Sequence, residues 1–319
     1  MSGKLHVDPE LKEQRPYFLT GASGLLGLNL AKYLTSRGAE VYGVTRRSET
    51  NLKGMRCFTH DLRENDRVQA LIREFRPSVL IHCAAATDVD WCERNPRETF
   101  SINTHPCRGL TSATNEVGGV FVLISTDSVF DGRIGNYVED DPPGPLNAYA
   151  KSKLAAEQLV AEHSQRWIII RTNIYGWNGQ NKNSLAEWIL QELSAGRSIT
   201  GFEDVTFAPL LASDLGPLIE KMVEKRMEGL YHAGALGAVS KYDFARQLAD
   251  VYGFDATLIR PGKLADAKLG APRPLNTSLL SKKLETEFGQ SLPSIEDGLK
   301  RFRDQGTNGW AQDLKKHIL

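Results

Sequence analysis

The sequence predicts an α/β fold with a doubly wound parallel sheet and a smaller C-terminal lobe. From residue 17 to residue 172, short apolar runs alternate with longer amphipathic stretches, as buried parallel strands joined by helices do. Glycines interrupt the passage from the first apolar run to the first amphipathic stretch. After residue 173 the alternation loosens. We therefore expect a first domain over 17–172 and a second lobe mainly over 173–319, with some of its segments returning to the first domain.

Five apolar runs are the predicted strands. They are short and rich in β-branched and aromatic residues, which is typical of strands buried on both faces. They cover residues 17–20, 40–45, 78–83, 120–125 and 167–172. Between the second and third runs, apolar residues recur at i, i+3, i+4 and i+7, which predicts a helix with one apolar face against the sheet. These residues are Val68, Leu71, Ile72 and Phe75.

Composition limits the partners of the protein. Lysine and arginine together number 39, as do aspartate and glutamate, so the charge balance does not indicate nucleic acid or an anionic membrane as a partner. The four cysteines lack the spacing of a zinc site and lie in or beside apolar runs, so we expect free thiols and no metal. Residues 1–16 lack the apolar core of a signal peptide, which predicts a flexible tail on a cytoplasmic protein.

A glycine-rich turn joins the first strand to the first helix, which we expect to begin at about Ser23. Backbone N–H groups at a helix N-terminus can bind the pyrophosphate of a dinucleotide, and glycine removes the Cβ that would block its approach. In TGASGLLG the first two glycines are spaced more widely than in the usual fingerprint, and a tight turn without ligand is the alternative. The cofactor contacts expected from this turn are Gly21, Ser23, Gly24, Leu25, Leu26 and Gly27.

The end of the second strand indicates which dinucleotide binds. An NAD site usually presents an acidic residue there to the ribose 2′-hydroxyl, whereas an NADP site presents arginine to the 2′-phosphate. Here the strand ends in Thr45, Arg46 and Arg47, and no carboxylate occupies that place. This favours NADPH, with NADH as the other cofactor considered and two solvated surface arginines as the alternative.

A tyrosine, a lysine and a threonine are the candidate catalytic residues. Tyr149 and Lys153 lie four residues apart in NAYAKSK, so a helix places both on one face. A nearby ammonium is expected to lower the pKa of the phenol and so to assist proton transfer. Thr126 follows the fourth predicted strand, at the sheet edge where ligands bind in doubly wound folds.

Several segments together resemble a known family. They are TGASGLLG, HCAAATDVDWCERNPRETFSINT, STDSVFDG, YVEDDPPGPLNAYAKSK and RPLNTSLLSKKL. They resemble the extended short-chain dehydrogenases/reductases, whose fold is of the Rossmann type, and within them the dTDP-4-dehydrorhamnose reductase branch. The likeness runs from about residue 17 to about residue 305.

The resemblance implies a reaction and further site residues. It implies hydride transfer from NADPH to C4 of a 4-keto-6-deoxy sugar nucleotide, with Tyr149 as proton donor and Lys153 holding the nicotinamide ribose. It implies a nucleotide-sugar partner, and a homodimer is the assembly considered. The further cofactor contacts implied are Asp61, Leu62, Ala84, Ala85, Ala86 and Asn103, and the substrate contacts are Thr87, Asp127, Ser128 and Asn173.

Two departures from the family pattern leave the sugar and the base open. Ser128 stands where the reductases carry a tyrosine, and Ala150 follows Tyr149 where they carry a glycine. A sugar-nucleotide 4,6-dehydratase is disfavoured because it needs a glutamate at Ser128. A 4-epimerase and a non-catalytic NADP-binding subunit, resembling the regulatory subunit of methionine adenosyltransferase, stay as alternatives.

Overall fold

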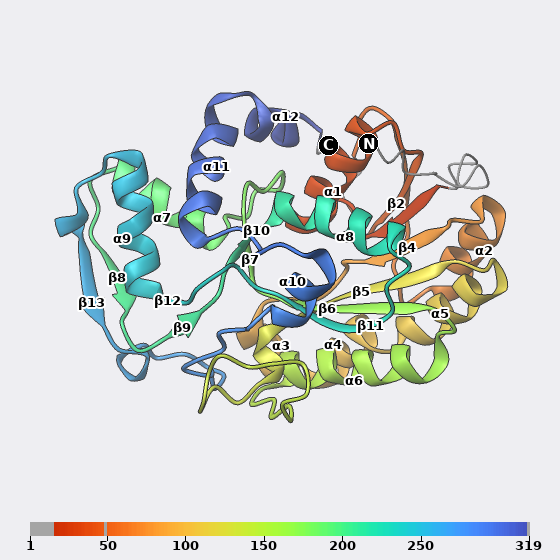
Figure 1. The fold of residues 1–319 in the computed structure, drawn as a ribbon, viewed down its shortest axis with the longest axis horizontal. Helices are drawn as coiled ribbons and strands as arrows, with labels where there is room; N and C mark the ends of the chain where they lie inside the picture. Colours follow the sequence, from red (N-terminus) through yellow and green to blue (C-terminus); the bar gives the residue numbers. More distant parts are fainter. Residues whose placement is uncertain (1–15, 48–49, 318–319) are drawn as a thin grey trace, which may run out of the picture.

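The computed structural model describes residues 16–47 and 50–317, and its centre is a seven-stranded parallel sheet (Figure 1). The expected tail falls on residues 1–16, and all of it but Pro16 lies outside the described residues. The strand order is β11-β6-β5-β4-β1-β2-β3, which reverses between β1 and β4 and confirms the predicted fold class. The strands are β1 (Tyr17–Thr20), β2 (Val41–Thr45), β3 (Met55–Thr59), β4 (Val79–His82), β5 (Val120–Thr126), β6 (Trp167–Thr172) and β11 (Gly229–Ala233).

Helices cover both faces of the sheet, as Figure 1 shows. Alternate residues of each central strand enter different cores: Phe121 of β5 packs with α2, α5 and α6, whereas Val122 packs on the face of α1 and α8. The predicted apolar stripe of α2 is confirmed, because Val68 and Ile72 are fully buried. The helices around this sheet are α1 (Leu25–Ser36), α2 (Asn65–Phe75), α3 (Val89–Arg94), α4 (Pro96–Asn103), α5 (Pro106–Glu116), α6 (Ala148–His163) and α8 (Leu215–Glu224).

The two edge strands, β3 and β11, were not predicted. An edge strand is covered on fewer sides, so its sequence need not be a continuous apolar run. β3 reads MRCFT and is only partly buried, and β11 begins at a glycine and includes His232. β11 pairs with β6, so a strand from the C-terminal half completes the sheet of the N-terminal half.

The rest of the C-terminal half forms helices and three small two-stranded sheets. Ser184 begins α7 with a capping box closed by Glu187, and Ser240 caps α9. The helices are α7 (Leu185–Ser194), α9 (Lys241–Tyr252), α10 (Lys282–Phe288), α11 (Ile295–Thr307) and α12 (Trp310–Lys316). The sheets pair β7 (Ile174–Tyr175) with β10 (Leu210–Leu211), β8 (Ile199–Phe202) with β13 (Ile259–Gly262), and β9 (Thr206–Phe207) with β12 (Val239–Ser240).

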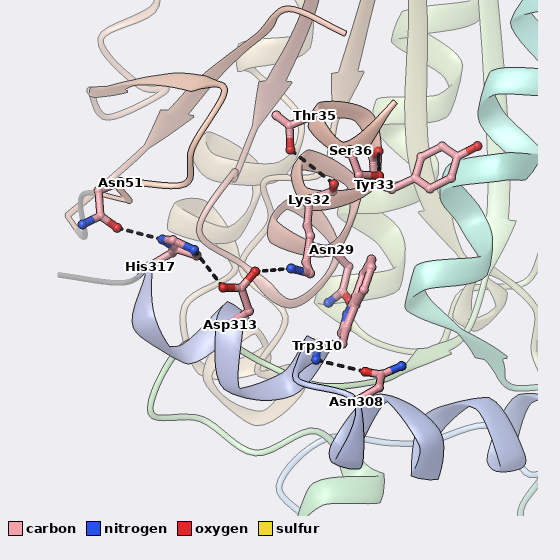
Figure 2. A network of polar contacts seen from close by, with 10 residues as sticks. All are labelled: Asn29, Lys32, Tyr33, Thr35, Ser36, Asn51, Asn308, Trp310, Asp313 and His317. Atoms are coloured by element: carbon pink, nitrogen blue, oxygen red, sulfur yellow. Dashed lines mark hydrogen bonds and ion pairs between the residues drawn. The ribbon is translucent and has the colours of Figure 1, made fainter. Parts of the chain in front are cut away.

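The last helix, α12, packs against α1, the helix that follows the glycine turn (Figure 2). Asp313 pairs with Lys32, and the Trp310 indole donates to Asn29 Oδ1 at 3.0 Å. Asn29 is buried and its amide donates to the carbonyl of Trp177 at 2.9 Å. The last helix of the described chain thus packs along the middle of α1. Among the described residues, no helix has the length and apolarity needed to cross a membrane.

Candidate active site

A cleft of about 730 Å³ opens at the carboxyl ends of the central strands. The residues that follow β1, β2, β4, β5 and β6 all contribute to its lining, which is where ligands bind in doubly wound sheets. Every cofactor and substrate contact expected from the sequence lines this cleft except Arg47 and Asn103.

The glycine turn forms one wall, and the structure shows why two of its glycines are required. Gly21 has φ +66°, and a Cβ there would lie 2.8 Å from the backbone of Ala84. A Cβ on Gly27 would lie 2.2 Å from the carbonyl oxygen of Gly21. These two glycines therefore serve the packing of the turn itself against α1 and the segment after β4.

The N-terminus of α1 faces the cleft without a side-chain cap. The helix begins at Leu25, two residues later than expected, with Gly24 as its N-cap. Gly24 has no side chain to accept a hydrogen bond, and the first turn contains no acidic residue. Because the N–H groups of a first helical turn lack partners within the helix, this end suits a phosphate group.

At the end of β2 the two arginines differ in position. Both are exposed, but only Arg46 lines the cleft, beside His60, Asp61 and Leu62. Asp61 accepts a hydrogen bond from Arg63 at 2.6 Å, and this bond holds the pKa of its carboxyl below the usual value. A 2′-phosphate at this corner would thus meet one cleft arginine, Arg46.

Asn103 is not a cleft residue, which corrects its expected role as a cofactor contact. It is fully buried. Its Oδ1 accepts from the Ala86 N–H at 2.7 Å, and its Nδ2 donates to the Ala86 carbonyl and to Ser152 Oγ, at 3.1 and 2.9 Å. Because Ser152 lies between Tyr149 and Lys153 in the chain, Asn103 joins the wall after β4 to α6. The motif that contains this asparagine does not reveal which way its amide points.

Tyr149, Lys153 and Thr126 meet in the cleft. Asn147 caps α6 by accepting the N–H of Ala150, which places Tyr149 in the first turn of the helix. Tyr149 is half-buried and lies beside the hydroxyl of Thr126. Lys153, one turn further along α6, is buried, and its Nζ donates to the carbonyl of Ile124 at 2.7 Å.

The ionisation of the tyrosine differs from the expectation. Burial raises the pKa of Tyr149 to about 12, the Thr126 hydroxyl opposes this shift, and Asp127 and Cys92 add to it. The Lys153 ammonium is not among the groups that shift the pKa of Tyr149, and its Nζ donates to the Ile124 carbonyl. The phenol therefore keeps its proton at neutral pH, as a proton donor must.

The opposite wall of the cleft is made of side chains that bond to one another. Asp127 Oδ2 accepts from Asn173 Nδ2 at 2.8 Å and from Thr277 Oγ1 at 2.5 Å. Its Oδ1 accepts from Thr126 at 3.1 Å and from Ser128 at 3.3 Å. Asp127 thus joins three parts of the chain, around the ends of β5 and β6 and before α10.

Two groups of residues near the site were missed by sequence reasoning. The segment 178–184 lines the cleft, and Gln180 donates to Ser23 Oγ in the glycine turn at 3.1 Å. Lys241, the first residue of α9, lies over the ring of Phe207. Its ammonium is also attracted by the side chain of Asp127. Burial lowers the pKa of Lys241 to about 8. No spacing signal marks either group, because each reaches the site through the fold of the C-terminal half.

The described residues show no group of three or more His, Cys, Asp or Glu arranged to hold a metal ion. The strand order, and a Tyr-x-x-x-Lys pair on the helix that enters the same cleft, place the protein among the extended short-chain dehydrogenases/reductases, a class of oxidoreductases.

Comparison with known proteins identifies the family within this class. A model of the RmlD substrate binding domain matches residues 16–308, so the chain belongs to this family. The probable low-salt glycan biosynthesis reductase Agl14 of Haloferax volcanii is 33% identical over 288 residues, covering 88% of this chain and 95% of that protein. The methionine adenosyltransferase 2 subunit beta of Danio rerio is 30% identical over 318 residues, covering 94% of each.

A solved structure extends the likeness to three dimensions. The dTDP-4-dehydrorhamnose reductase of Bacillus anthracis, crystallised in complex with NADP, superimposes with a TM-score of 0.82 at 28% identity. The match covers 91% of this chain and 99% of that one. The predicted family resemblance is confirmed.

Proposed function

We propose that the protein reduces the C4 keto group of a nucleotide-activated 4-keto-6-deoxy sugar with NADPH, and that Tyr149 donates the proton. One observation carries the proposal: the cleft that contains the uncapped start of α1 also contains Tyr149, Thr126 and Lys153. The name of the structural relative from B. anthracis, dTDP-4-dehydrorhamnose reductase, supports the substrate class.

The cleft residues fit a nicotinamide dinucleotide, which supplies the hydride when bound. The N-terminus of α1 would hold the pyrophosphate, Arg46 the 2′-phosphate, and Ala84, Ala85 and Ala86 the wall beneath the ring. In this assignment residues 17–172 form the dinucleotide-binding domain, and 173–319 mainly the substrate lobe.

Tyr149 and its neighbours carry out the proton transfer in this proposal. The Thr126 hydroxyl and the phenol bind the keto oxygen together, and the phenol then protonates the oxygen as it becomes an alkoxide. An alkoxide is far more basic than a phenolate, so a phenol with a raised pKa still donates readily. Lys153 would hold the ribose, and Thr87, Asp127, Ser128 and Asn173 would contact the sugar.

The test is direct. The purified protein, given NADPH and dTDP-4-keto-6-deoxyglucose, should consume NADPH and form a 4-hydroxy sugar nucleotide detectable by mass spectrometry. If no member of a full panel of 4-keto sugar nucleotides led to NADPH consumption, the proposal would be contradicted.

A second function is supported by one specific observation. The 30% identity to methionine adenosyltransferase 2 subunit beta covers nearly the whole of both chains, so a role as the partner of another enzyme is the alternative. In that case the protein would bind NADP without turnover and co-purify with a methionine adenosyltransferase. A 4-epimerase would instead keep NAD bound through purification. It would interconvert the two C4 epimers of a sugar nucleotide without net consumption of NAD.

A further inference from the structure

One stripe of α6 contacts the last three residues of β5. Tyr149, Lys153 and Glu157 recur every four residues, so they share one face of the helix. Tyr149 lies beside Thr126, and Lys153 donates to the carbonyl of Ile124. The third member is not in the cleft. Glu157 is buried, and it accepts a hydrogen bond from Ser125 Oγ.

Glu157 is also half of a buried ion pair. Arg171 of β6 donates to its carboxylate through Nη2 at 2.7 Å and through Nε at 3.1 Å. The side chains of Arg171 and Glu157 are 4% and 6% exposed, so both charges have lost most of their water. Arg171 is the register partner of Ser125, so the pair lies beside the end of β5.

A buried ion pair is poorly explained by stability alone. Removing two charges from water costs about as much as their attraction returns, and apolar residues of similar volume often serve as well. The neighbouring residues on this face, Leu123, Ala156 and Val160, are apolar and could pack against such a pair of side chains. Glu157 lies one helical turn from Lys153 on the same face of α6, and this position points to a role other than stability.

The charge around Lys153 depends on Glu157. Burial lowers the pKa of Lys153, and Cys107, Glu157 and Cys83 oppose this shift. Burial raises the pKa of both thiols to about 12, so at neutral pH neither is a thiolate, and His82, whose pKa burial lowers to about 3, is neutral. Glu157 is therefore the charged group among them that stabilises the ammonium.

We propose that Glu157, held by Arg171, is a positioning residue that fixes the end of β5 and keeps Lys153 charged in the cleft. This inference deepens the proposed function and rests on it. Glu157 acts through Lys153 and Ser125, since it does not itself line the cleft. A neutral Lys153 would be a poorer donor to a ribose hydroxyl, because a charged donor makes the stronger hydrogen bond.

Two variants separate this role from a structural one. Glu157→Gln keeps the shape and removes the charge, but leaves Arg171 buried and unpaired. The double variant Glu157→Leu with Arg171→Met removes both charges and replaces them with apolar side chains. Glu116→Gln breaks the exposed pair with Arg73 and is the control for charge removal far from the cleft.

NADPH affinity and kcat are measured against pH, together with the midpoint of thermal unfolding. In Glu157→Gln the alkaline limit of both profiles, which is the pH above which NADPH affinity and kcat fall, should move to lower pH, and the unfolding midpoint should drop. The double variant should recover the unfolding midpoint of the wild type and keep the shifted limit. Glu116→Gln should match the wild type throughout.

Three outcomes would overturn the inference. In the first, the alkaline limit of Glu157→Gln is the same as in the wild type. In the second, the double variant regains both the alkaline limit and the unfolding midpoint of the wild type. In the third, the double variant does not fold. The last would mean that the pair is needed for folding. If the wild type binds NADPH without turnover, the proposed reaction fails, while the affinity profile still tests Glu157.

Discussion

The two walls of the cleft are built from different parts of the chain and by different means. The wall around the glycine turn consists of backbone and small side chains at the ends of β1 and β4, in one half of the sequence. The wall around Asp127 consists of side chains whose bonds join the segments after β5, after β6 and before α10. A wall made of backbone admits any ligand with the right phosphate geometry, whereas one made of side chains can distinguish substrates.

The sharpest test of this division is Tyr149→Phe. In the proposed mechanism Tyr149 is the proton donor, so its replacement should lower kcat by about 10²- to 10⁴-fold, the usual contribution of general acid catalysis. NADPH affinity should stay close to that of the wild type, because the ring remains in place. Stopped-flow turnover and fluorescence titration measure the two quantities, and a parallel loss of both would show that the phenol supports the cofactor wall instead.

Gly27→Ala tests the backbone wall. The new Cβ would lie 2.2 Å from the Gly21 carbonyl oxygen, so the turn has to move. We expect a loss of about 1–3 kcal/mol in the free energy of unfolding and a marked loss of NADPH affinity. Gly24→Ala is the matched control, since its Cβ meets the same oxygen at 3.2 Å. Equal stability of the two variants in urea unfolding would contradict this explanation.

Thr277→Val tests the side-chain wall. It removes the shortest hydrogen bond to Asp127 and leaves that carboxylate free to turn. The KM for the sugar nucleotide should rise about tenfold, the effect of roughly 1.4 kcal/mol, while NADPH affinity is unchanged. Thr257→Val, on an exposed 3-10 helix remote from the cleft lining, is the control. A change in NADPH affinity would show that the two walls are coupled.

Arg46→Ala compares two arginines on the same wall. Loss of a charge-assisted contact to the 2′-phosphate should weaken NADPH binding about tenfold and leave NADH binding nearly unaltered. Arg47→Ala should have the smaller effect, because Arg47 does not line the cleft. Calorimetric titration of both cofactors decides, and an unchanged NADPH to NADH ratio in Arg46→Ala would remove the argument for NADPH.

The alkaline titration of Tyr149 is the smallest predicted effect. Its pKa rises from 10.0 to about 12 on folding, so its contribution to stability is complete below pH 10 and is lost as the pH rises through 12. The difference in phenolate absorbance between wild type and Tyr149→Phe should show one group titrating well above pH 10. A midpoint near 10 would mean that the phenol is less buried than the structure indicates.

Much of the fold could be predicted from the sequence because buried parallel strands require continuous apolar runs. The central strands from β1 to β6, apart from β3, were recognised in this way, whereas the edge strands β3 and β11 lack the pattern. The glycine turn was recognisable for a related reason, since close backbone approach excludes most side chains. At Gly21 and Gly27 the atoms that a Cβ would meet belong to the protein itself. Close packing around the turn is therefore enough to require glycine at both positions.

The sequence alone determined the five central strands, the glycine turn and the candidate residues Thr126, Tyr149 and Lys153, because local periodicity and steric limits are set by neighbouring residues. Only the tertiary structure decided that Asn103 is buried and accepts a hydrogen bond from the Ala86 N–H. It likewise decided that the Lys153 ammonium donates to the backbone carbonyl of Ile124 instead of to the phenol. It also decided that Thr277, 150 residues beyond Asp127, closes the other wall. These contacts join segments far apart in the chain, and burial and hydrogen bonding between such segments leave no fixed spacing in the sequence.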